Sequence, residues 1–230
     1  MPDTKKIYQS DADRYHALVS REDYEGHLLP AILAIDPLKG KAVVELGAGT
    51  GRVTNLIAPH ASSLTAMDRS WHMLSYGKSN LETSGTNKCQ YALGVHNNLP
   101  MAAHSADLIL SGWSFCYAAI DAGTNWQSAL EQALREVSRV LRPGGKLILI
   151  DSLGTGYETP HRPDVLLNYL EYLDTHSFSS HWVRTDYCFR DTAEALNLTR
   201  FFFGDDALPM WETELGVIVP ECTGLWWKSF

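Results

Sequence analysis

Short apolar runs alternate with helix-like segments over the first two thirds of the 230-residue chain. Strands alternating with helices form βαβ units, so this order predicts an α/β fold with a mostly parallel sheet covered on both faces. The clearest helical segment precedes Pro143, Gly144 and Gly145, which end its pattern before the next run. Five runs have the length and composition of buried strands: 41–47, 63–68, 90–94, 106–112 and 146–151.

The chain changes character after Asp151, where a loop rich in Gly and Pro precedes a predicted helix at 164–176. Strand-like sequence follows at 181–189 and again at 216–227, which brings the expected strands to seven. Between them, Asp191 and Glu194 are a plausible cap for a helix that ends at Gly204. With no linker visible, we expect one domain over 1–230, made of an N-terminal helical lid (1–35), a cofactor-binding core (40–151) and substrate-side elements (152–230).

The composition narrows the class of partner. The formal net charge of -8 argues against a nucleic-acid backbone as the main ligand. No apolar run approaches the roughly 20 residues of a membrane span, and the N-terminus lacks the apolar centre of a signal peptide. The four cysteines are scattered without a CxxC pair, so neither a zinc knuckle nor a disulfide framework is indicated. We expect a cytoplasmic protein, either a monomer or a homodimer.

Three glycines within five positions, Gly47, Gly49 and Gly51, directly follow the first predicted strand. Glycine tolerates positive φ and has no Cβ, so a ligand can lie against this backbone. Arg52 stands where a dinucleotide fingerprint has Gly or Ala, and the GxxxxGK[ST] pattern of a P-loop is absent. Asp68 ends the second strand 21 residues after Gly47, where a carboxylate can accept hydrogen bonds from both ribose hydroxyls. A nucleoside-containing cofactor is therefore expected.

These segments resemble, in order, the motifs of the class I, seven-stranded S-adenosylmethionine-dependent methyltransferases. The resemblance is closest to small-molecule enzymes of the quinone-biosynthesis type. It implies a Rossmann-like sheet of strand order 3-2-1-4-5-7-6 with the seventh strand antiparallel, S-adenosylmethionine as cofactor and S-adenosylhomocysteine as product. The matching segments are VVELGAGTG, LTAMDRSWHML, ALGVHNNLPMAAHSADLILSGWSF and LREVSRVLRPGGKLILID.

The resemblance also implies a set of cofactor contacts, with Met73 beside the adenine and the N-terminal segment around Tyr15 folded over the cofactor. One departure is Val95, where many relatives have an Asp that accepts from the adenine amino group. Adenine recognition would then depend on His96 and Asn97. The expected cofactor-binding residues are Tyr15, Glu45, Gly47, Ala48, Gly49, Gly51, Asp68, Arg69, Met73, His96, Asn97 and Ser111.

The acceptor is expected beyond the carboxyl ends of the strands, where ligands bind in open α/β sheets. Trp113, Tyr157, Glu158 and Tyr187 are the expected substrate-binding residues, although packing roles for Trp113 and Tyr187 remain open. His181 and Tyr157 are the candidate catalytic residues, with His181 as base because its ordinary pKa suits that task. Metal-dependent relatives have carboxylates at the end of the fourth strand, and since Ser, Gly and Trp stand there at 111–113, no metal is expected.

Three other interpretations remain open from the sequence. The same sheet serves nucleotide-dependent oxidoreductases, although Arg52 and the later motifs oppose that assignment. A non-catalytic module that only binds the cofactor is compatible with the altered adenine loop. Methylation of a peptide or protein is the third, whereas the NPPY-type sequence of base or glutamine methylation is absent after the fourth strand. Methyl transfer to a small-molecule acceptor is the interpretation that the motifs favour.

Overall fold

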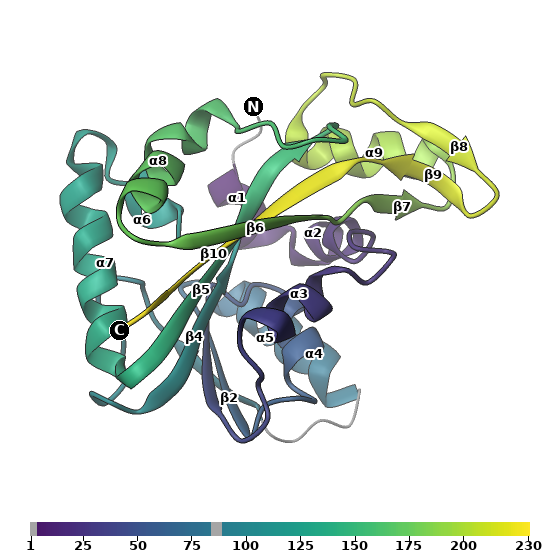
Figure 1. The fold of residues 1–230 in the computed structure, drawn as a ribbon. Coiled ribbons are helices and arrows are strands. Elements are labelled where there is room, and N and C mark those ends of the chain that lie inside the picture. Colours follow the sequence, from purple (N-terminus) through teal and green to yellow (C-terminus); the bar gives the residue numbers. More distant parts are fainter. Residues whose placement is uncertain (1–3, 84–88) are drawn as a thin grey trace.

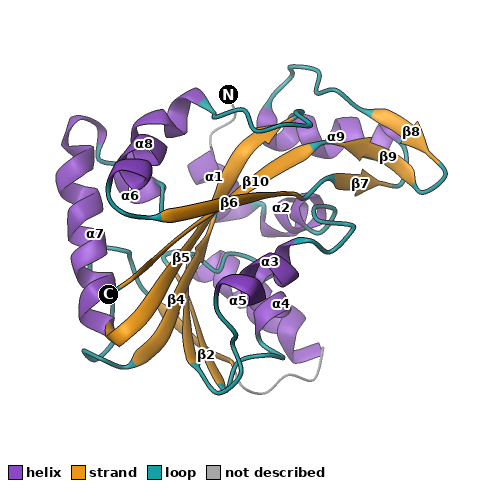
Figure 2. Cartoon of the chain, viewed as in Figure 1, coloured by secondary structure: helices purple, strands orange, loops and turns teal. Residues whose placement is uncertain are grey.

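The structure, a computed structural model, describes residues 4–83 and 89–230. Its main sheet has seven strands in the order β3-β2-β1-β4-β5-β10-β6. Figures 1 and 2 label five of them, β2, β4, β5, β10 and β6. The strands are β1 (Ala42–Leu46), β2 (Ser63–Asp68), β3 (Cys89–Leu93), β4 (Ala106–Gly112), β5 (Leu141–Thr155), β6 (Ser179–Arg184) and β10 (Glu221–Ser229).

The pairing of the strands confirms the expected order. β1 is parallel to β2 and β4, β2 to β3, and β4 to β5. β10 is antiparallel to both β5 and β6, so it is the antiparallel seventh strand of the predicted topology. The glycine loop and the ends of β2, β3 and β4 therefore meet at one edge of the sheet, where parallel strands present their carboxyl ends.

Two expected strands are each interrupted, which corrects the predicted boundaries. The run 216–227 divides at Pro220 into β9 (Gly216–Val219) and β10, because proline has no N–H to donate to a ladder. The run 181–189 divides at Thr185 and Asp186 into β6 and β7 (Tyr187–Phe189). The separated pieces β7 and β9 pair with β8 (Trp211–Thr213) in a second, three-stranded sheet.

Helices cover both faces of the main sheet. Alternate residues of each strand point to opposite faces, so Ile109 packs toward α7 and α8 while Leu108 packs toward α3 and α4. In α7, the buried residues Leu130, Ala133 and Val137 recur at helical spacing, as expected. The helices on the two faces are α3 (Leu28–Ile35), α4 (Arg52–Ile57), α5 (Trp71–Thr83), α6 (Tyr117–Ile120), α7 (Trp126–Val140) and α8 (Leu167–Thr175).

The last helix, α9 (Thr192–Phe203), begins and ends as predicted. The Asp191 carboxylate accepts a hydrogen bond from the N–H of Glu194 at 2.8 Å, and Gly204 follows the last turn with φ of 100°. α9 packs with α2 (Ala12–Val19) against the second sheet, where Leu18, Phe189 and Val219 are buried. This packing places α2 and the preceding α1 (Thr4–Ser10) beside the glycine loop.

The loop between α2 and α3 pairs with the chain between β6 and β7. The N–H of Asp23 donates to Thr185 O at 3.1 Å, and the N–H of Cys188 donates to Arg21 O at 2.9 Å. The segment after α2 is thus joined by backbone hydrogen bonds to Thr185 and to β7. Within residues 4–83 and 89–230, none of the helices is both long and apolar enough for a membrane crossing.

Candidate active site

A cavity of about 350 Å³ lies at the carboxyl ends of β1, β2 and β4. This volume is within the range of cavities that bind small molecules. Its walls come from the glycine loop, from the chain after β2, β3 and β4, and from α1, α2 and α6. The sequence-predicted residues on these walls are Tyr15, Gly47, Gly49, Asp68, Arg69, Met73, His96, Asn97 and Trp113.

The three glycines of the loop all have positive φ but meet different surroundings. A Cβ on Gly49 would lie 3.8 Å from the Met73 methyl with nothing nearer, so its backbone is open to the cavity. A Cβ on Gly47 would lie 1.8 Å from Ser114 Oγ, because that side chain packs directly on Gly47. Gly51 instead faces Gly77 of α5, 3.3 Å from the position of a Cβ. Only Gly49 therefore gives a ligand unobstructed access to the main chain.

Asp68 is held at the cavity wall by two backbone donors. Its Oδ2 accepts from the N–H of Gly49 and its Oδ1 from the N–H of Ser70, each at 2.8 Å. Burial raises the pKa of this carboxyl, while the two N–H groups oppose the shift. Since each carboxylate oxygen has further acceptor capacity, Asp68 can bind two hydroxyls of a ligand without losing its present contacts.

Three tyrosines from separate elements cover the cavity next to the glycine loop. The rings of Tyr8 and Tyr15 meet edge to face at 5.4 Å, and Tyr8 Oη lies 3.3 Å from Tyr117 Oη. Burial is the main cause of the raised pKa of both Tyr8 and Tyr15, so these hydroxyls stay protonated at neutral pH. Tyr117 was not predicted, because nothing in its local sequence distinguishes it from a packed aromatic residue.

His96 extends from the chain after β3 to the chain after β4. Its Nε2 lies 3.1 Å from Ser114 Oγ, and its ring lies 5.3 Å from that of Phe115. Burial lowers the pKa of His96 to about 4, so the ring is neutral at pH 7. Arg69 pairs with Asp121 at 2.8 Å, and both side chains line the same cavity. Ser114 and Asp121 were also missed, since no motif marks them.

Trp113, immediately after β4, forms the part of the wall nearest Arg52. It has φ of 49°, which is uncommon for a residue other than glycine, and its N–H donates to Ile150 O at 2.6 Å. The guanidinium of Arg52 lies over its ring at 3.9 Å from the centroid. Arg52 in turn pairs with the buried Glu22 at 2.5 Å. The wall is thus supported by an ion pair behind it.

Comparison with known proteins identifies the domain. A family described as "Methyltransferase domain" matches residues 44–149. Over these residues, a little under half of the chain, the sequence is that of a methyltransferase domain. A crystal structure of an S-adenosylmethionine-dependent methyltransferase from Aquifex aeolicus has the same fold, with a TM-score of 0.57, 17% sequence identity and 98% of each chain covered.

Two curated relatives of this methyltransferase domain are named for quinone biosynthesis. The demethylmenaquinone methyltransferase of Chlamydia pneumoniae is 32% identical over 157 residues, covering 65% of this chain and 61% of the relative. The ubiquinone/menaquinone biosynthesis C-methyltransferase UbiE of Rubrivivax gelatinosus is 26% identical over 150 residues, covering 64% and 55%. The chain therefore spans less than two thirds of the length of these relatives.

The cofactor of class I methyltransferases is S-adenosylmethionine, and the cavity of this domain fits it. Gly49 presents bare backbone with room in front of it, and Asp68 presents carboxylate oxygens suited to a ribose. His96 and Asn97 line the cavity beside Val95, where the adenine was expected. The residues that the structure describes contain no group of three or more His, Cys, Asp or Glu side chains that could hold a metal ion.

Four predicted cofactor residues of the methyltransferase domain lie behind the cavity wall. Ala48 donates its N–H to Met67 O, and Ser111 donates its hydroxyl to Leu46 O at 2.9 Å. Gly51 directly precedes α4, as its N-cap, and faces α5. Glu45 is buried, and its Oε2 accepts from Thr54 Oγ1 at 2.6 Å. These residues support the glycine loop from inside the protein, and none of the four lines the cavity.

The substrate-side residues other than Trp113 also lie outside the cavity. His181 is exposed on β6, and Tyr187 is buried on β7. Alternation along one unbroken strand would place these two residues on the same face, but the strand breaks between them, so the alternation does not continue. Tyr157 is 45% exposed and stacks on His161 with 4.0 Å between ring centroids. The role of His181 and Tyr157 as catalytic residues therefore has no geometric support.

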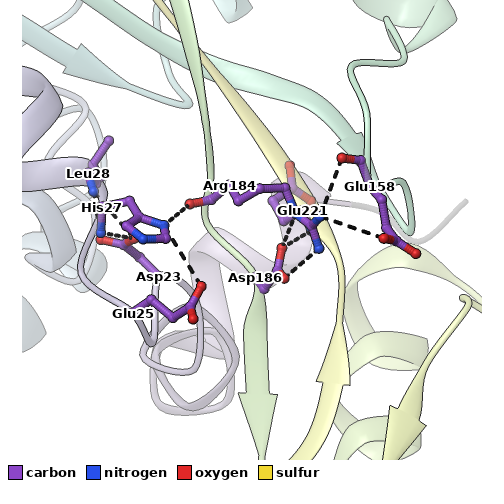
Figure 3. A network of polar contacts seen from close by, with 8 residues as sticks. All are labelled: Asp23, Glu25, His27, Leu28, Glu158, Arg184, Asp186 and Glu221. Carbon is purple, nitrogen blue, oxygen red and sulfur yellow. Dashed lines mark hydrogen bonds and ion pairs between the residues drawn. The ribbon is translucent and has the colours of Figure 1, made fainter.

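Glu158 lies in a separate polar network at the surface (Figure 3). Arg184 forms a bidentate pair with Asp186, at 2.7 Å and 2.6 Å, and donates to Glu158 O at 3.3 Å. Asp186 also accepts from the N–H of Glu221 at 3.0 Å, and His27 Nδ1 lies 3.0 Å from Arg184 O. This network joins the loop before α3 to β6 and β10.

Glu45→Gln separates a structural from a ligand-binding role for Glu45. Burial raises the pKa of Glu45 to about 7, above its ordinary value near 4.5. Between these two pH values the folded chain holds a proton that the unfolded chain has released, so the free energy of unfolding falls as pH rises through this window. We expect the Gln variant to lose this part of the pH dependence, measured by urea unfolding, and to bind S-adenosylhomocysteine as the wild type does. A large loss of affinity would instead show that Glu45 contacts the ligand.

Proposed function

We propose that this chain is an S-adenosylmethionine-dependent methyltransferase that transfers a methyl group to a small-molecule acceptor and yields S-adenosylhomocysteine. One observation carries the proposal: the open backbone of Gly49 and the carboxylate of Asp68 face the same cavity, and the N–H of Gly49 donates to Asp68 Oδ2 at 2.8 Å. The quinone-biosynthesis names of the curated relatives support a small, planar acceptor. The net charge of -8 disfavours a nucleic-acid substrate.

The reaction needs alignment more than it needs catalytic side chains. S-adenosylmethionine supplies a methyl group activated by positive sulfur, and in an in-line displacement the acceptor's lone pair forms the new bond while the old bonding pair stays on sulfur. A proton on the attacking atom leaves to solvent or to a base. Positioning of this kind can lower a barrier by on the order of 7 to 11 kcal/mol. The chain's task is therefore to fix the two reactants and exclude water.

Different residues of the cavity have different roles in binding the cofactor. We assign Gly49 and Asp68 to the ribose end, and His96 and Asn97 to the adenine. Tyr8 and Tyr15 act as the lid, since α1 and α2 bring them over the cavity. In this proposal the lid, the core and the substrate-side elements act as one domain. The enzyme works in the cytoplasm and needs no metal ion.

A binding and transfer experiment tests this function. Calorimetry with S-adenosylhomocysteine, with NAD as the comparison ligand, establishes the cofactor. Incubation with S-adenosylmethionine carrying a radiolabelled methyl group and a metabolite extract then reveals the acceptor fraction. We expect S-adenosylhomocysteine alone to bind, and label to appear in a small molecule. Binding without any labelled product would support a non-catalytic module, and label in protein would support a peptide substrate.

Asp68→Asn is expected to weaken S-adenosylhomocysteine binding by about 1 to 3 kcal/mol, the usual effect of losing charge-assisted hydrogen bonds. The amide removes the negative charge and one of the two acceptor oxygens that a diol requires. Calorimetry measures the effect. Asp107→Asn is the matched control, because Asp107 also accepts from a backbone N–H at 2.8 Å but pairs with Arg142 away from the cavity. Equal affinities for both variants would contradict the ribose role.

A further inference from the structure

The loop between β3 and β4, residues 94–105, forms one wall of the cavity. A Cβ on Gly94 would lie 3.1 Å from Pro100 Cδ, so the two ends of the cavity-lining part of the loop pack closely together. A loop can recognise a ligand with its backbone only where that backbone is held in one position, so the contacts that hold this loop matter for what it binds. The residues of the loop that line the cavity are Gly94, Val95, His96, Asn97 and Leu99.

Two charged side chains of α7, Glu136 and Arg139, hold this loop by its backbone. They stand three residues apart in the helix, so they are neighbours on its surface. The Glu136 carboxylate accepts from the N–H of Leu99 at 2.8 Å. Arg139 donates from Nη1 to Met101 O at 2.7 Å and from Nη2 to Leu99 O at 3.0 Å. Both backbone polar groups of Leu99 are thus bonded to side chains of one helix, and its own side chain is buried.

The two charged side chains also hold each other. Arg139 donates from Nε to Glu136 Oε1 and from Nη2 to Glu136 Oε2, each at 2.8 Å, which is the bidentate pairing of a guanidinium with a carboxylate. The hydrogen bonds from Arg139 are the main cause that lowers the pKa of Glu136 to about 2, so this carboxylate stays ionised at neutral pH. Because the guanidinium is planar and its donors point in fixed directions, the pair sets the positions of two carbonyls and one N–H together.

A third side chain of α7 holds the loop nearer the cavity. Gln132 precedes Glu136 by four residues, on the same face of the helix, and its Nε2 donates to Asn97 O at 3.3 Å. Within this turn of the loop, the N–H of Asn98 donates to Val95 O at 3.1 Å. The three α7 side chains do not line the cavity themselves, so they support the loop from the side away from a ligand.

The hydrogen-bonding pattern of a purine makes the position of this backbone important. Adenine presents an amino donor at C6 and an acceptor at N1, whereas hypoxanthine presents an oxo acceptor and an N–H donor at the same two places. A fixed backbone can match one of these patterns and leaves the other with unpaired polar groups, which is how hydrogen-bonding sites reject close analogues. A loop that is free to shift can adapt to both, and the apolar side chain of Val95 cannot make the choice.

We propose that Gln132, Glu136 and Arg139 are positioning residues that fix the loop after β3 and thereby make the cavity select a 6-aminopurine over a 6-oxopurine. The inference rests on the proposed function, because it assumes that the purine of the cofactor lies against this loop. In this scheme the three side chains act through the loop backbone without touching the ligand. Their loss therefore weakens recognition of the purine in particular.

Two matched ligands test the selection without requiring turnover. S-adenosylhomocysteine and S-inosylhomocysteine differ only in the amino or oxo group at C6 and the proton on N1. Calorimetry gives the affinity of the protein for each. We expect the wild type to bind S-adenosylhomocysteine about 30-fold more tightly, a ratio expected when one or two polar groups are left unpaired in a binding site.

Arg139→Met is the variant that tests positioning, because it removes the guanidinium and keeps an apolar side chain of similar reach. We expect the affinity for S-adenosylhomocysteine to fall about tenfold, and the preference over S-inosylhomocysteine to fall to about threefold or less, because the loop is no longer held in one position. Arg135→Met is the matched control in the same helix. Arg135 forms an exposed pair with Glu131 at 3.8 Å, so this control should keep the wild-type affinity and ratio.

The outcomes separate this inference from the proposed function. Failure of S-adenosylhomocysteine to bind the wild type would remove the proposed function itself. If it binds, the inference is overturned when the wild type binds both ligands equally, or when Arg139→Met keeps the full wild-type ratio. A merely structural ion pair would give that second result, with a lower Tm alone.

A second variant decides the case if Arg139→Met does not fold. The Gln132 side chain is exposed, so Gln132→Ala removes the hydrogen bond to Asn97 O with little risk to the fold. We expect the ratio of the two affinities to fall about threefold, the usual effect of one hydrogen bond. An unchanged ratio in this variant would then overturn the inference.

Discussion

Gly49→Val is expected to abolish S-adenosylhomocysteine binding, with a loss of affinity of at least about 100-fold, which corresponds to about 2.7 kcal/mol. The new side chain would project into the space in front of the glycine loop, where only the Met73 methyl lies within 4 Å of a Cβ. It would also shield the backbone beside Asp68, whose Oδ2 accepts from the N–H of the same residue. Calorimetry with the purified variant measures the loss.

A control must separate lost space from backbone strain, because Gly49 has φ of 55° and valine is strained there. Gly40→Val introduces the same side chain at another left-handed position, with φ of 85° and nothing within 4 Å of a Cβ. Gly40 precedes β1, at the opposite end of that strand from the cavity. We expect this control to lower thermal stability and to bind S-adenosylhomocysteine normally. Normal binding by Gly49→Val would show that no ligand lies against this loop.

The parts of the fold that were predictable from sequence depend on local signals. The apolar runs at 41–47 and 106–112 became β1 and β4, because buried parallel strands need little more than continuous apolar sequence. Asp191 and Gly204 delimit α9 because capping is decided by neighbouring residues. The second sheet was not predictable in this way. Its formation depends on Pro220 and on backbone pairing between β7 and β9, which lie far apart in the sequence.

In the candidate site, too, some residues could be predicted from sequence and others could not. Gly49 and Asp68 could be identified from their positions at the ends of β1 and β2, since topology brings those two ends together. Ser114 could not, because its contact with Gly47 depends on how the chain turns after β4. His181 was proposed as the base because of its residue type, but it is exposed on β6 and does not line the cavity. The chemistry of these side chains could be predicted from residue type, whereas the direction in which each side chain points is known only from the structure.

Glu22→Ala is expected to destabilise the fold more than the other side-chain substitutions considered above, by about 3 to 5 kcal/mol. Removing one partner of a buried ion pair leaves the other charge without compensation, and Arg52 has its guanidinium between Trp113 and Glu22 with a side chain only 14% exposed. For a chain of this size the loss corresponds to a drop in Tm of roughly 6 to 20 °C, measured by calorimetric melting.

Two comparisons show whether the unpaired charge is the cause of that loss. Glu131→Ala breaks an exposed pair with Arg135, at 3.8 Å, and should cost about 0 to 1 kcal/mol. The double variant Glu22→Gln, Arg52→Met should recover most of the stability that Glu22→Ala loses, because no buried charge then remains at this position. If the double variant melts as low as Glu22→Ala, then packing around Glu22, rather than its charge, supports the wall of the cavity.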